Sequence, residues 1–167
     1  MAYDRWHKAN PLSPLVMGFC RALVYIGAAL VVSGALTAGV LTAALALCAH
    51  VVGLTYAARQ ESLDRIDRLW PLAILVLPLA AGALALAAGP MAVAVWLALA
   101  ALDALAVLTL HRRSRPGAVP RSVAALIAAI SVVDALFAAS MGATGVVLAC
   151  LAAFALTSLL QRIIPGT

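Results

Sequence analysis

The residues best suited to do chemistry lie in one short polar segment, residues 58–68, which reads ARQESLDRIDR. Its three carboxylates, Glu61, Asp64 and Asp67, are spaced three residues apart. Residues three apart share one face of a helix, so a helical segment would gather the three acids into one stripe. Mg²⁺ prefers such oxygen ligands and bridges to phosphate groups. The segment therefore predicts a Mg²⁺ site made by these acids or, as the alternative, a solvated helix with internal ion pairs.

Basic side chains that can hold a phosphate accompany the acidic stripe. Arg59 and Arg65 lie in the same segment, and their guanidinium groups match pairs of phosphate oxygens. Lys8 lies in a second polar segment near the start of the sequence, together with Arg5. We interpret Lys8 as a phosphate contact, with a basic flank that sets membrane topology as the alternative.

Four ionisable residues lie inside long apolar stretches: Arg21, His50, Asp103 and Asp134. Such groups are costly in a bilayer and often functional. Arg21 and His50 lie at similar depth in neighbouring stretches, which suggests that they face one cavity. Structural roles are the alternatives: a long arginine can reach the headgroups, and the histidine and the acids can bond neighbouring helices.

The chain that carries these residues is too apolar for a soluble protein. Of its 167 residues 66% are hydrophobic and 10% charged, and the mean hydropathy is +1.12. Soluble domains have roughly 45–50% apolar and about 25% charged residues. A chain of 17.0 kDa cannot bury this much apolar surface. The composition excludes a water-soluble enzyme and a nucleic-acid-binding protein. It predicts an all-α polytopic membrane bundle, which has the lipid bilayer as a partner.

Six stretches approach the roughly 20 apolar residues that a transmembrane helix needs. They form one predicted domain over residues 1–167, with spans at 14–33, 36–57, 69–88, 91–110, 121–139 and 144–160. The connections after the first, third and fifth spans are short and carry no charge. Nine of the eleven Lys and Arg residues lie in the two tails and in the second and fourth connections. Membrane proteins carry an excess of Lys and Arg in their cytoplasmic segments. This distribution therefore predicts a multi-pass protein of the inner or plasma membrane with both termini in the cytoplasm.

Several runs of residues, in their order, resemble the later part of UbiA-type membrane prenyltransferases. They are YDRWHKANPLSPLVMGFCR at 3–21, GLTYAARQE at 53–61, LWPL at 69–72 and RIIPGT at 162–167. The resemblance covers essentially the whole chain. It implies an all-helical bundle that transfers an isoprenoid chain from a prenyl diphosphate to an aromatic or other lipophilic acceptor.

The resemblance also implies roles for the polar residues. Enzymes of this family hold the diphosphate through Mg²⁺ bound by two Asp-rich cytoplasmic loops, and segment 58–68 corresponds to the second loop. By this resemblance, Glu61 and Asp64 would be the catalytic carboxylates. Together with Asp67 they would also be the metal ligands. The diphosphate contacts become Lys8, Arg21, Arg59 and Arg65.

The sequence departs from the family in both Asp-rich motifs. In the second, the spacing of Glu61, Asp64 and Asp67 does not reproduce the family's Asp-x-x-x-Asp pattern. The first Asp-rich motif, of the type Asn-Asp-x-x-Asp, does not occur in it. We expect that motif on about four spans preceding Met1, supplied in cis or by a protein partner, and we expect the chain to be inactive alone. Two alternatives stay open: a non-catalytic membrane subunit of a larger complex, and a small proton-coupled transporter that uses Asp103 and Asp134.

Overall fold

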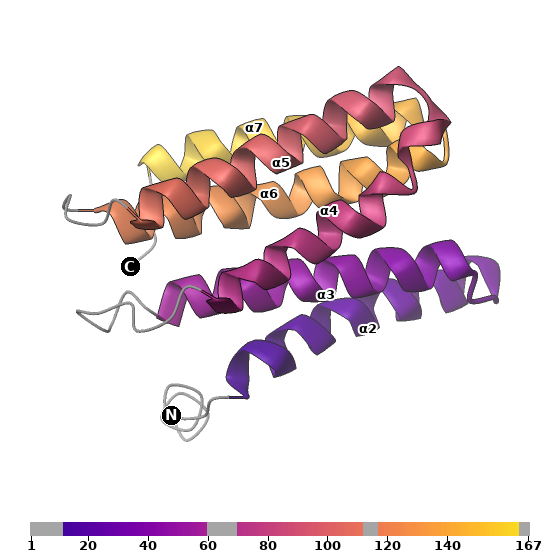
Figure 1. Ribbon diagram of the computed structural model, residues 1–167. Helices are drawn as coiled ribbons and strands as arrows, with labels where there is room; N and C mark the ends of the chain where they lie inside the picture. The colour runs from indigo at the N-terminus through magenta and orange to yellow at the C-terminus, as the bar shows by residue number, and fades with distance from the viewer. Residues whose placement is uncertain (1–11, 60–69, 112–116, 164–167) are drawn as a thin grey trace.

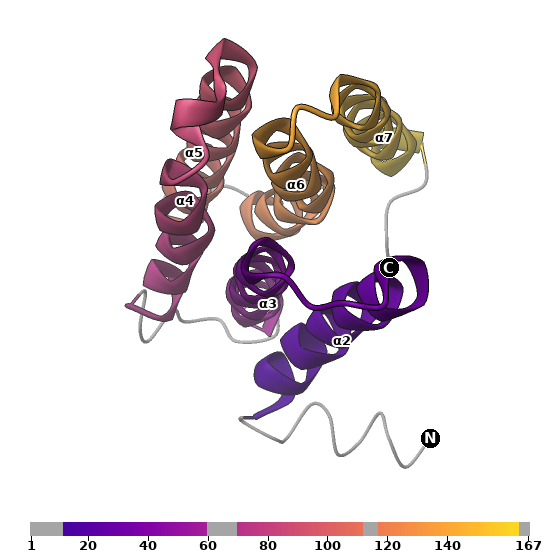
Figure 2. The same ribbon diagram turned by 90° about the vertical axis from the view of Figure 1, so that its right-hand side faces the viewer.

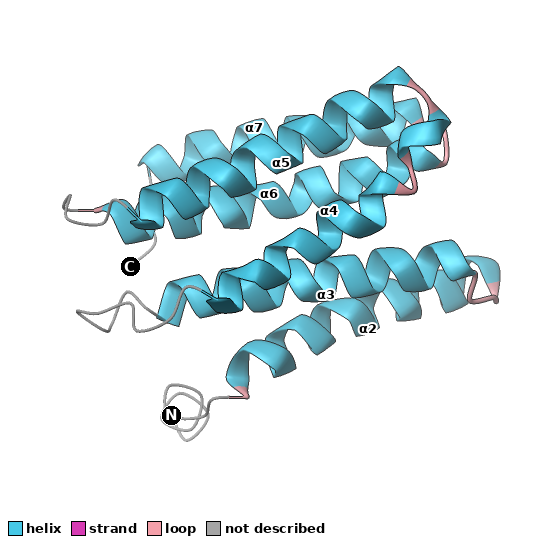
Figure 3. Cartoon of the chain, in the orientation of Figure 1, coloured by secondary structure: helices cyan, strands magenta, loops and turns pink. Residues whose placement is uncertain are grey.

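The computed structural model describes residues 12–59, 70–111 and 117–163, and every secondary-structure element in these ranges is a helix (Figure 3). The all-α class is therefore confirmed. Five helices are long and apolar enough to cross a membrane. They are α2 (Ser13–Ser33), α3 (Ala38–Arg59), α5 (Pro90–His111), α6 (Ala118–Ser140) and α7 (Thr144–Ile163).

The predicted third span, 69–88, is not one continuous α-helix. It consists of a 3₁₀-helix η2 (Trp70–Leu75), the short helix α4 (Val76–Ala83) and a second 3₁₀-helix η3 (Leu86–Ala88). Pro78 explains the first change, because it has no N–H to bond the carbonyl four residues earlier. Proline is tolerated in the first turn of a helix, and α4 begins two residues before it. The predicted third span is therefore a broken apolar segment and not a sixth long helix.

Glycine and proline set the bounds of the first long helix. Pro14 occupies the first turn of α2, where its fixed backbone angle suits a helix start. Gly34 follows the last residue with φ of 65°, and its N–H donates to the carbonyl of Leu30 at 3.0 Å. Glycine adopts this left-handed conformation without strain, so the chain can turn at once towards α3.

Helices α3 and α6 form the centre of the bundle. In the end-on view of Figure 2, α2 and α7 flank this central pair on one side, and α4 and α5 flank it on the other. About half of the most apolar window is buried in α3 (56%) and in α6 (50%), against 11% in α2 and 6% in α7. The outer helices therefore present most of their apolar surface to the surroundings, as expected of helices that face lipid.

All the crossings run between the same two ends of the bundle (Figure 1). At one end α2 begins and α7 ends, and the chain enters and leaves segments 60–69 and 112–116 there. At the other end lie the short connections after α2, after α4 and after α6. The predicted contrast between short uncharged and long charged connections therefore corresponds to two different ends of the molecule.

Candidate functional site

Most of the charged residues predicted for a diphosphate and metal site lie outside the described residues. These are Lys8, Glu61, Asp64, Arg65 and Asp67. Of the remaining two, Arg59 is the last residue of α3 and Arg21 is exposed on α2. In the described ranges no group of three or more His, Cys, Asp and Glu side chains could hold a metal ion. The Mg²⁺ site therefore stays a prediction for the segment that follows α3.

The structure does not bring Arg21 and His50 into one cavity. Arg21 is exposed, whereas His50 is completely buried and directs its ring away from α2, towards α5 and α6. Similar depth along two helices was a poor guide, because the rotation of each helix about its own axis decides which side chains meet. The prediction of a shared cavity is wrong.

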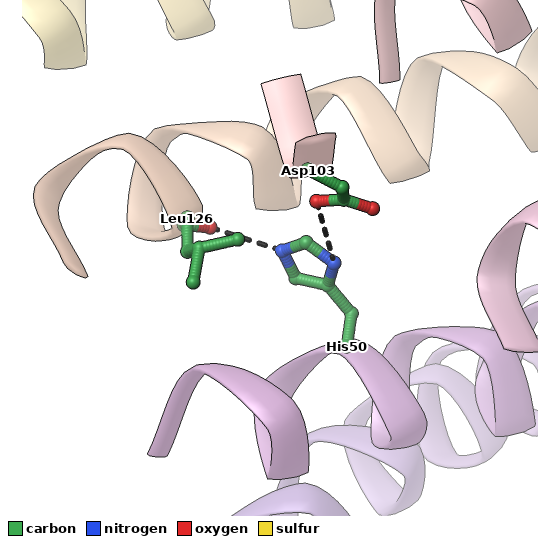
Figure 4. Close-up of polar contacts among 3 residues, drawn as sticks. All are labelled: His50, Asp103 and Leu126. Carbon is green, nitrogen blue, oxygen red and sulfur yellow. Dashed lines mark hydrogen bonds and ion pairs between the residues drawn. The ribbon is translucent and has the colours of Figure 1, made fainter. Parts of the chain in front are cut away.

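The partners of His50 are on α5 and α6 (Figure 4). Its Nε2 lies 3.0 Å from the backbone carbonyl of Leu126 on α6. Its Nδ1 lies 4.0 Å from Oδ1 of Asp103 on α5. His50 is 0% exposed and Asp103 is 4% exposed. Three helices therefore converge on one polar cluster in the middle of the bundle, which we call the His50 cluster: His50, Asp103 and the Leu126 carbonyl.

The surroundings of the His50 cluster are apolar. On the side of the short connections it adjoins a hydrophobic cluster that includes Leu47 and Leu99. On the other side it adjoins a second cluster, which includes Leu54 and Ala106. Nδ1 of His50 and both carboxyl oxygens of Asp103 have no hydrogen-bond partner among the described residues. Such groups are rare in protein interiors because they lose their bonds to water without replacement.

A second polar contact joins the outer helix α2 to α6. The phenol of Tyr25 donates a hydrogen bond to Oδ1 of Asp134, and both side chains are partly buried. Arg21 lies one turn before Tyr25 on α2. Asp103 and Asp134 therefore belong to separate contacts, one around His50 and the other around Tyr25.

An apolar groove of about 510 Å³ runs between α2, α3 and the broken segment. Its lining side chains are almost entirely aliphatic or aromatic. The one hydroxyl, that of Thr42, donates to the carbonyl of Ala38 in its own helix. The lining residues are Leu15, Phe19, Thr42, Leu45, Ala46, Cys48, Ala49, Val52, Ile74, Leu77, Ala80 and Ala81. The groove is therefore suited to an apolar chain and offers almost nothing to a polar ligand.

Sequence reasoning missed three features: the pairing of His50 with Asp103, the role of Tyr25, and the groove. The first left only a partial signal, because equal depth does not say whether two side chains face each other. His50 lies about two turns before the end of α3, and Asp103 lies about two turns before the end of α5. Because both helices end on the same side of the bundle, the two side chains share one depth. The groove left no comparable signal, since its lining residues resemble those of any lipid-facing surface.

Comparison of this chain with protein-family models, with curated proteins and with solved structures finds no match.

Proposed function

We propose that this chain forms part of a UbiA-like membrane prenyl-transfer protein, which moves an isoprenoid chain from a prenyl diphosphate to a lipophilic or aromatic acceptor. The observation that carries the proposal is the apolar groove between α2, α3 and α4. Its volume of about 510 Å³ falls within the range of ligand pockets, roughly 300–1,000 Å³. An isoprenoid chain is apolar and flexible, so a groove without polar demands is the kind of shelter that it needs.

The connectivity of the groove supports a diphosphate at one of its ends. Residues 1–11 lead into α2, and residues 60–69 connect α3 to η2. At the end of the bundle where α2 begins and α3 ends, the groove lining includes Leu15 of α2, Val52 of α3 and Ile74 of η2. The predicted charged contacts lie in these two segments or on the helices beside them. The phosphate contacts are Lys8, Arg21, Arg59 and Arg65, and the metal ligands are Glu61, Asp64 and Asp67. The proposed arrangement therefore pairs a charged head site with an apolar tail site.

The chemistry divides between the two sites. Mg²⁺ bound at Glu61, Asp64 and Asp67 would neutralise the charge of the leaving diphosphate. The arginines would hold the diphosphate oxygens through paired hydrogen bonds. The walls of the groove would keep water from the allylic cation formed on ionisation, so that the acceptor and not water captures it. We further propose that the bundle spans the inner or plasma membrane with both termini in the cytoplasm, since the basic residues gather at that end.

Direct binding tests the proposal without requiring turnover. The purified chain in lipid nanodiscs would be titrated with farnesyl thiodiphosphate, a non-hydrolysable probe, in the presence and absence of Mg²⁺. Ala80 is exposed and lines the groove, so Ala80→Trp fills the groove without disturbing the core. Ala104 is exposed on α5 outside the groove, and Ala104→Trp is the matched control.

We expect Ala80→Trp to weaken binding at least tenfold and Ala104→Trp to leave it unchanged. Glu61→Ala should remove the dependence on Mg²⁺, and it should abolish prenyl transfer once the bundle is supplied with the remaining helices of such an enzyme. Binding that is equal in both tryptophan variants would contradict the assignment of the groove. Full transfer activity in Glu61→Ala would contradict the role of that carboxylate.

A second candidate function is that of a non-catalytic subunit in a membrane complex. The observation that favours it is α7, of which only 6% of the most apolar window is buried within the chain. In this case the chain should co-purify with a partner in a fixed ratio, and Glu61→Ala and Asp64→Ala should leave that ratio unchanged. Failure of the thiodiphosphate to bind, together with such co-purification, would favour the subunit over the enzyme.

A further inference from the structure

The His50 cluster has a defined proton count, which follows from its geometry. A backbone carbonyl can only accept a hydrogen bond, so the contact of 3.0 Å with Leu126 requires a proton on Nε2 of His50. In a neutral imidazole the other nitrogen then carries a lone pair. That nitrogen, Nδ1, faces Oδ1 of Asp103 at 4.0 Å, and an ionised carboxylate is also only an acceptor.

Two acceptors that face each other in an apolar core are unfavourable. Neither Nδ1 of His50 nor the carboxylate of Asp103 has another hydrogen-bond partner among the described residues. A single additional proton resolves the conflict. It produces either an imidazolium beside a carboxylate or an imidazole beside a carboxylic acid, and the pair is neutral in both cases. A neutral, hydrogen-bonded pair is the form that an apolar interior tolerates.

We infer that His50 and Asp103 form a buried site that binds one proton between Nδ1 and Oδ1, and that this proton joins α3 to α5 in the folded bundle, while the proton on Nε2 joins α3 to α6. The proton comes from water as the helices pack and returns to water when they separate. The site lies outside the groove, since neither residue contributes to the groove lining. The inference therefore does not depend on the proposed prenyl-transfer function.

Other ionisable groups on the surrounding helices do not compete for this proton in the structure. Asp134 lies more than two turns from Leu126 along α6 and is bonded to Tyr25 of α2. Cys48 of α3 lines the groove, and Cys150 of α7 packs against the hydrophobic cluster that includes Leu47 and Leu99. The described stretch of α4 contains no ionisable residue. The remaining described groups on these elements lie towards the helix ends: Tyr56 and Arg59 on α3, His111 on α5, Arg121 on α6 and Arg162 on α7. Arg21 is exposed on α2.

The proton has a predictable effect on stability. An unfolded imidazole gives up its second proton near pH 6.5, and an unfolded aspartate is ionised there. Above about pH 6.5, and up to the pH at which the folded pair gives up its own proton, the folded pair therefore holds more protons than the unfolded pair. Stability falls with rising pH wherever the folded state binds more protons. The ratio of folded to unfolded protein should fall by up to about tenfold per pH unit in this range.

Reversible unfolding in mixed detergent and SDS, measured from about pH 6.5 to pH 9, tests this expectation. Asp103→Asn replaces the carboxylate by an amide, whose N–H can donate to Nδ1 without a titratable proton. We expect the wild type to lose stability as the pH rises above about 6.5, until the folded pair gives up its proton. The ratio of folded to unfolded Asp103→Asn protein should fall less over the same pH range. Asp134→Asn leaves the His50 cluster intact and should follow the wild type. Parallel curves for the wild type and Asp103→Asn would overturn the inference.

A spectroscopic readout keeps the test decisive if Asp103→Asn does not fold. The ring nitrogens of His50 would be observed by ¹⁵N NMR of histidine-labelled wild-type protein in nanodiscs near pH 7. The signals are assigned by their loss in His50→Gln, since the chain contains only His7 and His111 besides. We expect a protonated Nε2 and an Nδ1 signal shifted away from that of a bare nitrogen. A bare Nδ1 beside a protonated Nε2, or a bare Nε2, would contradict the shared proton.

Discussion

The phenol of Tyr25 on α2 donates a hydrogen bond to Oδ1 of Asp134 on α6, across 109 positions of sequence. This contact joins an outer helix, which buries little of its own surface, to the central helix α6. An acid that faces the inside of a bundle is tolerable in a bilayer only when it has such a partner. The pair therefore explains how Asp134 can lie within an apolar helix.

Removing the phenol should weaken the attachment of α2. We expect Tyr25→Phe to lower the free energy of unfolding by about 0.6 kcal/mol and by no more than about 1.7 kcal/mol, the average and the maximum found for hydrogen bonds between membrane helices by double-mutant cycles. A double-mutant cycle with Asp134→Leu isolates the contact, because Tyr25→Phe should cost nothing further once the acid is gone. Equal effects of Tyr25→Phe in both backgrounds would show that the two side chains are not coupled.

Gly18 should be essential for the close packing of α2 on α3. A Cβ at this position would lie 2.6 Å from Cγ2 of Val52 and 2.8 Å from the carbonyl oxygen of Cys48. One of these atoms is backbone, so the helices would have to separate. We expect Gly18→Ala to cost about 1–3 kcal/mol of unfolding free energy.

Gly27 of the same helix provides the matched control. A Cβ there meets nothing within 4 Å, and alanine favours a helix over glycine by about 1 kcal/mol. We expect Gly27→Ala to be neutral or slightly stabilising in the same SDS unfolding assay. If both alanine variants behave alike, the contact between α2 and α3 is looser than the structure indicates.

Trp96 should hold the short helix α4 against α5. Its indole N–H donates to the carbonyl of Leu79, in the middle of α4, at 2.8 Å. We expect Trp96→Phe to cost about 1 kcal/mol, since the ring is kept and the donor is lost. Proteolysis or hydrogen exchange within 76–88 should rise in this variant and stay unchanged in Leu97→Phe, an exposed control on the same helix.

The two ends of the bundle should lie on opposite sides of the membrane. In a variant lacking Cys20, Cys48 and Cys150, single cysteines would be introduced as Ala35→Cys, Met141→Cys and Ile163→Cys, all at exposed positions. We expect a membrane-impermeant maleimide to label the first two in intact cells, and Ile163→Cys only after permeabilisation. Labelling of Ile163→Cys alone in intact cells would show the inverted orientation.

The sequence by itself determined the helical class, the five long apolar helices and the separation of charged from uncharged connections. These are local properties. The length of each apolar stretch and the positions of glycine, proline and arginine can be read from one continuous segment without knowing how the helices pack. The break in the predicted third span was also encoded locally by Pro78, although hydropathy concealed it. The charged residues of segment 60–69 lie outside the described residues, so their predicted role stays a prediction.

The tertiary structure alone decided which buried polar groups meet. His50 and Asp103 are 53 positions apart, and Tyr25 and Asp134 are 109 apart. Each pairing depends on how every helix is rotated about its axis, and that rotation is set by packing against neighbours and not by composition. In helices that are apolar on nearly every face, periodicity carries little information about rotation. The His50 cluster and the groove between α2, α3 and α4 therefore emerged only once the helices were packed together.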